Sequence, residues 1–201
     1  MDEQPLRDKS DVELLAALLT GPAAARLMRR FGNLRSLLQA PTGELVACPG
    51  IGRGRLEALR AVPELARRYY SESLPCGEAI RNPADTETFL QAHMQHLDHE
   101  LFCCLFLDNR HRVLGFNKLF RGTIDGTSVY PREVVKEALG INAAAVILAH
   151  NHPSGVAEPS QADERITKRL KSALELVDIR LLDHLIIGDG RATSLASRGL
   201  I

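Results

Sequence analysis

The feature that most restricts the fold is the apolar run "AAAVILA" at 143–149, which lies between two amphipathic helical patterns at 130–140 and 160–177. A run this short and this apolar is typical of a strand that is covered by helices. Other segments carry strand patterns (101–107, 112–122, 179–190 and 191–201), and a helical pattern at 84–97 precedes them. Because strands alternate with helices, the sequence predicts an α/β domain, with 101–107 and 112–122 forming a hairpin.

The first 70 residues have only helical patterns. Ser10 and Glu13 have capping-box spacing before a leucine-rich run, and Gly32 follows a second helical pattern as a stop. Residues 71–83, "SESLPCGEAIRNP", keep no period and contain two prolines. We therefore expect a small all-α domain at 1–70, a linker at 71–83 and the α/β domain at 84–201.

Composition and charge exclude several classes of protein. Lys+Arg and Asp+Glu both number 25, so overall charge indicates no nucleic-acid partner, although residues 1–70 carry a net charge of +3. No apolar run approaches the roughly 20 residues of a membrane span, and the charged start does not resemble a signal peptide. The spacing of the four cysteines fits no zinc ribbon or CxxC motif. We expect a cytoplasmic protein with reduced thiols and no membrane partner, in which Cys103 and Cys104 are buried.

Two histidines one residue apart follow the strand at 143–149. Alternate side chains of a strand share a face, so His150 and His152 present two imidazoles to one place. Asp163 lies in the first turn of the next helix and is a candidate third ligand for zinc, which would leave one coordination position open for catalysis. Each part has a simpler explanation: Ser160 and Asp163 alone form a capping box, and histidine pairs are frequent on surfaces. The combination is much more specific than its parts.

The segment that contains these residues, and further segments of the chain, resemble known families. "HNHPSG" followed by "PSQAD" is similar to the JAMM (MPN-type) metalloprotease motif, and blocks such as "LFLDNRHRVLG" and "LLDHLIIGDG" resemble the bacterial RadC family. The resemblance is dense over about residues 82–201 and looser before them. It implies a mixed sheet flanked by helices, with a cytidine-deaminase-like architecture, preceded by a small all-α helix-hairpin-helix-like domain.

The resemblance also implies the parts of a hydrolytic site. His150, His152 and Asp163 match the ligands of one zinc ion per chain, and Ser160 matches a serine that stabilises an oxyanion. Glu100 is the best match for the general base.

Other residues are less suited to that site. Glu133 is the second candidate for the base, and Asn117 and Lys118 argue against a base on the strand at 112–122. Asn151 replaces the serine or threonine of eukaryotic deubiquitinases, so ubiquitin-like substrates are not inferred. His93, His96 and His99 lie on the helix at 84–97 or at its end, and we expect them to be exposed to solvent. For His184, packing within its strand is favoured over support of a ligand.

The N-terminal domain contains a possible DNA contact. "CPGIGRGRLEALRA" at 48–61 resembles the hairpin of helix-hairpin-helix modules, in which Gly50 and Gly52 would expose backbone amides and Arg53 and Arg55 would add charge. It could equally be a tight structural turn between helices.

Three functions remain open. The first is a zinc-dependent, metallopeptidase-like hydrolase of an unknown protein or peptide substrate. The second is a RadC-like accessory protein of DNA repair or recombination that binds DNA without peptidase activity. The third is an inactive structural MPN domain, against which the complete ligand set argues.

Overall fold

The computed structural model describes residues 5–71, 76–80, 82–122 and 129–201. Its contacts divide the chain into two compact units, Met1–Arg68 and Tyr69–Ile201. The predicted linker at 71–83 lies partly outside the described residues. No described helix is both long enough and apolar enough to cross a membrane.

The first unit is entirely helical in its described part. Ser10 caps its first α-helix, and the reciprocal bonds with Glu13 that the sequence predicts are present. Four leucines with no exposed surface or nearly none form the centre of its own apolar core: Leu27, Leu37, Leu45 and Leu59. The helices are η1 (Leu6–Asp8), α1 (Asp11–Leu18), α2 (Gly21–Phe31), α3 (Leu34–Gln39), α4 (Thr42–Val46) and α5 (Arg53–Ser71), the last of which continues into the second unit.

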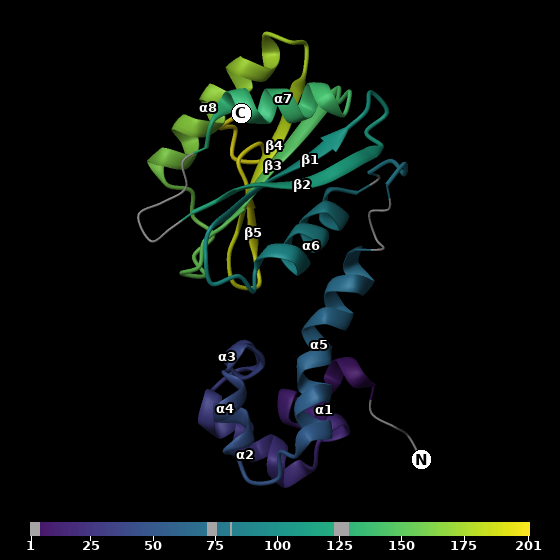
Figure 1. The fold of residues 1–201 in the computed structure, drawn as a ribbon, viewed down its shortest axis with the longest axis vertical. Helices are drawn as coiled ribbons and strands as arrows, with labels where there is room; N and C mark the ends of the chain where they lie inside the picture. The colour runs from purple at the N-terminus through teal and green to yellow at the C-terminus, as the bar shows by residue number, and fades with distance from the viewer. Residues whose placement is uncertain (1–4, 72–75, 81, 123–128) are drawn as a thin grey trace. The chain divides into compact units, whose positions relative to one another are not determined.

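The second unit is built on a five-stranded mixed sheet (Figure 1). The strands are β1 (Leu101–Leu107), β2 (Val113–Arg121), β3 (Ala145–Asn151), β4 (Arg180–Ile187) and β5 (Ala192–Ser194), in the spatial order β2-β1-β3-β4-β5. The strands β3 and β4 are parallel, whereas the other neighbours are antiparallel. The predicted hairpin is confirmed as β1 and β2.

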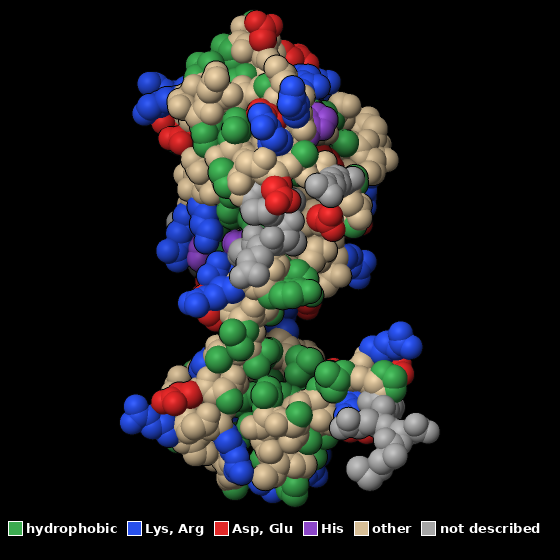
Figure 2. All heavy atoms as spheres, turned by 90° about the vertical axis from the view of Figure 1, so that its right-hand side faces the viewer, with side chains coloured by type: hydrophobic (Ala, Val, Ile, Leu, Met, Phe, Trp, Pro, Cys, Tyr) green, Lys and Arg blue, Asp and Glu red, His purple; other side chains and the backbone are tan. Residues whose placement is uncertain are grey.

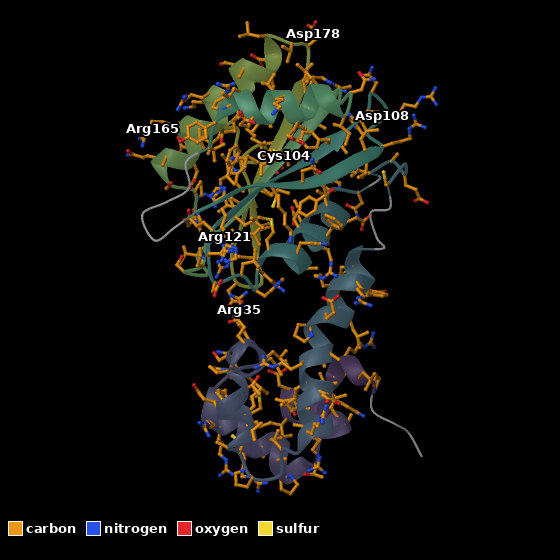
Figure 3. All side chains as sticks on the ribbon, viewed as in Figure 1. Arg35, Cys104, Asp108, Arg121, Arg165 and Asp178 are labelled. Carbon is orange, nitrogen blue, oxygen red and sulfur yellow. The ribbon has the colours of Figure 1, made fainter. Side chains whose placement is uncertain are left out.

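Helices cover both faces of this sheet. Figure 1 shows α6 (Pro83–Met94) on one face, and α7 (Pro131–Gly140) and α8 (Gln161–Glu175) on the other. Every residue of β1 and of β3 is buried, because these central strands have a helical layer on each side. Cys103 and Cys104 are buried as predicted, and Cys104 lies at the centre of the sheet (Figure 3). The α/β fold with an N-terminal helical region is therefore confirmed.

The helix α6 differs from its prediction. It ends at Met94, so His96 and His99 follow the helix instead of lying on it. His93 was predicted to be exposed, but it is buried against Phe89 and Phe116. Its Nδ1 lies 2.8 Å from the carbonyl oxygen of Phe89. A single polar ring on the apolar face of a helix can be buried once such a backbone partner exists.

Candidate metal centre

Three side chains of the second unit converge at the end of β3. The Nε2 atom of His150 lies 3.0 Å from Nε2 of His152 and 3.0 Å from Oδ1 of Asp163. Nε2 of His152 lies 3.5 Å from Oδ2 of Asp163. The structure thus brings together the three residues that the sequence singles out as metal ligands.

The strand keeps the two histidines on one face. His150 belongs to β3, and the amide of His152 donates to the carbonyl of Ile187 at 2.9 Å, which continues the pairing with β4 beyond the last strand residue. His152 therefore remains extended. The chain then turns at Gly155, which has φ = +80° and whose amide donates to the carbonyl of His152 at 2.9 Å. That turn reverses the chain before α8, so the first turn of α8 lies beside the end of β3.

Asp163 is oriented by the start of its own helix. The Ser160 hydroxyl donates to Oδ2 of Asp163 at 2.7 Å and accepts from the Asp163 amide at 3.2 Å, which is the predicted capping box. Oδ1 of Asp163 faces His150. Ser160 therefore orients the carboxylate in this geometry, and its hydroxyl hydrogen must leave Oδ2 before it can reach a bound oxyanion. Farther along the same helix, Arg165 points away from the sheet (Figure 3).

Glu100 lies near His152. The antiparallel register of β1 and β3 ends with the pair Phe102 and His150, and Glu100 directly precedes β1. The charge of Glu100 also contributes to raising the pKa of His152. The structure thus places Glu100 beside the three converging residues, whereas Glu133 forms ion pairs with its helix neighbours Arg132 and Lys136.

The side chain between the two histidines points elsewhere and contacts both neighbours of Glu100. Asn151 is 1% exposed. Its Oδ1 accepts from the Leu101 amide at 2.9 Å, and its Nδ2 donates to the His99 carbonyl at 2.9 Å. Asn151 therefore fixes the backbone on each side of Glu100, a contact that sequence reasoning did not identify.

The charges of the site depend on one another. Burial alone would raise the pKa of Asp163, but its contacts with His150 and His152 outweigh burial and hold that pKa well below its ordinary value. The hydrogen bond with Asp163 raises the pKa of His152 despite partial burial. The site therefore favours one anionic carboxylate beside cationic charge, which a bound metal can supply in place of protons.

The donor set fits a small divalent metal. A tetrahedral zinc ion with bonds of about 2.0–2.1 Å separates its ligand atoms by about 3.3 Å. The two Nε2 atoms here are 3.0 Å apart, and each lies near one carboxylate oxygen of Asp163, at 3.0 Å from His150 to Oδ1 and 3.5 Å from His152 to Oδ2. These separations are close to what zinc requires. Among the described residues, these three form the one group of His, Cys, Asp or Glu side chains that could hold a metal ion.

Comparison with known proteins agrees with this geometry. A family model described as "RadC-like JAB domain" matches residues 80–200, more than half of the chain. The chain belongs to the RadC family. Relatives named "UPF0758 protein" include one from Nitrosococcus oceani, which is 55% identical over 96% of this chain and 89% of its own length. Another, from Thioalkalivibrio sulfidiphilus, is 56% identical over the same shares of the two chains.

In this RadC family member, His184 contacts a residue of the candidate site, an interpretation that the sequence did not favour. It was expected to be a packed strand residue, and it is fully buried in β4. However, its Nε2 lies 2.8 Å from Nδ1 of His150. Local sequence patterns could not favour this contact, because it depends on β4 lying parallel to β3 with His184 facing His150.

The predicted DNA-contacting residues lie in the first unit. Gly50 has φ = +92°, and two arginines donate to the carbonyls of the turn: Arg26 to Pro49 at 2.9 Å and Arg55 to Gly50 at 2.6 Å. Arg53 forms an exposed ion pair with Glu57. On the face of this unit drawn in Figure 2, Lys and Arg side chains are dispersed among other types instead of forming one stripe.

Proposed function

We propose that this protein is a zinc-dependent hydrolase of JAMM type that cleaves amide bonds, peptide or isopeptide, in a protein or peptide substrate. The observation that carries the proposal is the convergence of His150, His152 and Asp163, with Glu100 near His152. His150, His152 and Asp163 would hold one zinc ion per chain. Two imidazoles and one carboxylate leave a coordination position for water or substrate.

The chemistry follows from the side chains around that position. Bound zinc lowers the pKa of a water molecule to about 7 and polarises a carbonyl group. Glu100 accepts the proton of the attacking water and delivers it to the leaving nitrogen. Ser160 turns its hydroxyl from Asp163 towards the developing oxyanion. Asp163 remains anionic throughout, in keeping with its low pKa.

Two variants test the proposal separately. We expect the purified protein to contain one zinc ion per chain by mass spectrometry, and His152→Ala to contain none. We expect Glu100→Gln to retain zinc but to lose hydrolysis of peptide or isopeptide substrates found in a screen with the wild type, because the amide cannot accept the proton. A wild-type protein that takes up no zinc on reconstitution contradicts the metal site. Full hydrolysis by Glu100→Gln contradicts the role of Glu100.

A second function, DNA binding by the first unit, is favoured by the hairpin before α5. The positive φ of Gly50 turns the chain there, and the side chains of Arg26 and Arg55 lie on the turn. The amides of Gly52 and Arg53 stand at the start of a 19-residue helix. This arrangement suits the phosphate of a DNA backbone and would be compatible with hydrolysis in the second unit.

A salt titration tests DNA binding. We expect fluorescence anisotropy with single-stranded and branched DNA to show binding that weakens steeply with salt, and Arg53→Glu to weaken it further. Arg110→Glu, an exposed substitution in the other unit, is the matched control. Absence of binding at low salt, or an equal effect of both variants, contradicts this function.

A further inference from the structure

A buried chain of hydrogen bonds connects two of the three ligands through residues that are not ligands. Nδ1 of His150 lies 2.8 Å from Nε2 of His184. Nδ1 of His184 lies 2.6 Å from Oγ1 of Thr167, and Oγ1 of Thr167 lies 2.5 Å from the carbonyl oxygen of Asp163. The chain thus crosses from β3 to β4 and then to α8. His184 and Thr167 are 0% and 1% exposed, so water does not compete for these bonds.

The direction of every hydrogen bond in this chain follows from the carbonyl oxygen of Asp163, at which the chain ends. A carbonyl oxygen only accepts, and two oxygens at 2.5 Å need a hydrogen atom between them. The single hydroxyl hydrogen of Thr167 is therefore directed to Asp163. Oγ1 of Thr167 must then accept from His184, so the hydrogen of the His184 ring is on Nδ1.

The same reasoning extends to the ligand. His184 is 0% exposed, and its two ring nitrogens meet Thr167 and His150 rather than a carboxylate, so the ring is uncharged and its Nε2 carries a lone pair. That lone pair accepts from His150, whose hydrogen is therefore on Nδ1. Nε2 of His150 is then free of hydrogen and faces Asp163 and His152.

The tautomer of His152 is set by a single hydrogen bond to the backbone. Its Nδ1 lies 2.8 Å from the carbonyl oxygen of Val156, which can only accept. Nε2 of His152 is therefore also without hydrogen when the ring is neutral. Nδ1 of His150, by contrast, lies beside a ring nitrogen, Nε2 of His184, so the tautomer of His150 depends on that of His184.

We propose that His184 and Thr167 are positioning residues that hold His150 as the Nδ1–H tautomer and so present its Nε2 to the metal. The inference rests on the proposed metal site. Thr167, together with His184, thereby links His150 on β3 to Asp163 at the start of α8. Partners of this kind orient ligand imidazoles in many metalloproteins, and their loss typically lowers metal affinity by about 10–100-fold.

Matched pairs of variants separate this role from simple packing. Thr167→Val keeps the shape and removes the hydroxyl, whereas Thr167→Ser keeps the hydroxyl. His184→Phe keeps an aromatic ring, whereas His184→Gln restores an acceptor for His150 and a donor for Thr167. We expect zinc affinity, measured by competition with a chromogenic chelator, to fall about 10–100-fold in Thr167→Val and His184→Phe. We expect Thr167→Ser and His184→Gln to recover most of that loss.

A spectroscopic readout is independent of zinc. In the chelator-treated wild type at alkaline pH, nitrogen-15 NMR of the imidazole rings should show hydrogen on Nδ1 of both His150 and His184. Hydrogen on Nε2 of either ring overturns the inference, as does equal zinc affinity in Thr167→Val and Thr167→Ser. Failure of the wild type to bind zinc, with Nδ1–H tautomers observed, contradicts the proposed function but leaves the hydrogen-bond chain supported.

Discussion

At the scale of single residues, the site depends on buried and partly buried polar side chains that are paired. Asn151 uses both ends of its amide on the backbone beside Glu100, and Asp163 uses Oδ1 for His150 and Oδ2 for the helix cap and His152. Buried polar groups of this kind fix a geometry because the alternative is an unpaired donor or acceptor. Each can therefore be tested by removing one partner.

Replacing Asn151 should disturb Glu100 without removing the metal ligands. Asn151→Ala leaves the Leu101 amide and the His99 carbonyl without their partners, so we expect a loss of about 1–3 kcal/mol in the free energy of unfolding by urea. We expect zinc content to stay at the wild-type level while hydrolysis declines. Asn109→Ala, an exposed turn substitution, is the control. Unchanged stability would show that the amide is not an anchor of this backbone.

Zinc affinity should decrease as pH falls through neutrality. Zinc needs the neutral imidazole of His152, and the pKa of that ring is raised by its hydrogen bond with Asp163 and by nearby Glu100. A raised pKa means that protons compete from a higher pH than at an ordinary histidine. Competition with a chromogenic chelator at one pH below and one pH above neutrality measures the zinc affinity. His96→Ala, an exposed substitution, is the control. Equal affinity at both pH values is the contrary result.

At the scale of elements, the loop between β3 and α8 is held by close backbone packing against the end of β4. A Cβ atom at Gly188 would lie 2.5 Å from the Gly155 carbonyl oxygen and 2.8 Å from the Ala157 amide nitrogen. Between them, Val156 supplies the carbonyl that binds His152. Val156 therefore links the packing of this loop to the ring of His152, one of the proposed metal ligands.

Gly188→Ala should accordingly weaken zinc binding from outside the ligand set. The loop must move to accommodate the methyl group, which shifts the Val156 carbonyl away from His152, and we expect zinc affinity to fall by at least about 10-fold. Gly140→Ala is the matched control, because a Cβ atom there meets nothing within 4 Å. The same chelator competition measures both variants. Equal affinities would indicate that the loop adapts without moving that carbonyl.

At the scale of the whole molecule, the two units have separate apolar cores. The core of the first unit includes Leu27, whereas Leu148 belongs to the α7 and α8 side of the sheet in the second. A ligand that binds one folded unit stabilises that unit by mass action, by about 2.7 kcal/mol at a concentration 100 times its dissociation constant.

Zinc should therefore stabilise the second unit selectively. In calorimetry of the full chain, we expect Leu27→Ala and Leu148→Ala to lower different parts of the unfolding profile, each by about 2–5 kcal/mol. Added zinc should raise the part that Leu148→Ala lowers and leave the other unchanged. A single transition affected equally by both substitutions would show that the units unfold together.

Much of the fold and part of the site followed from local patterns in the sequence. Short apolar runs identified the central strands and a period of 3.6 the main helices, and the spacing of His150, His152, Ser160 and Asp163 identified the candidate ligands and the cap. These residues are close in sequence, so strand alternation and a helix start are enough to bring them together. The exposure predicted for His93 was wrong because helix packing, which local pattern does not specify, buried that ring.

The sequence by itself determined which side chains could bind a metal, because their spacing belongs to one strand, one turn and one helix start. Only the tertiary structure decided what surrounds them. The contact of His184 with His150 spans 34 residues, and that of Asn151 with Leu101 spans 50. Such contacts depend on which strands are neighbours, in which direction and in which register. No local pattern contains that information, because the strand order is set by the packing of the complete sheet between its helices.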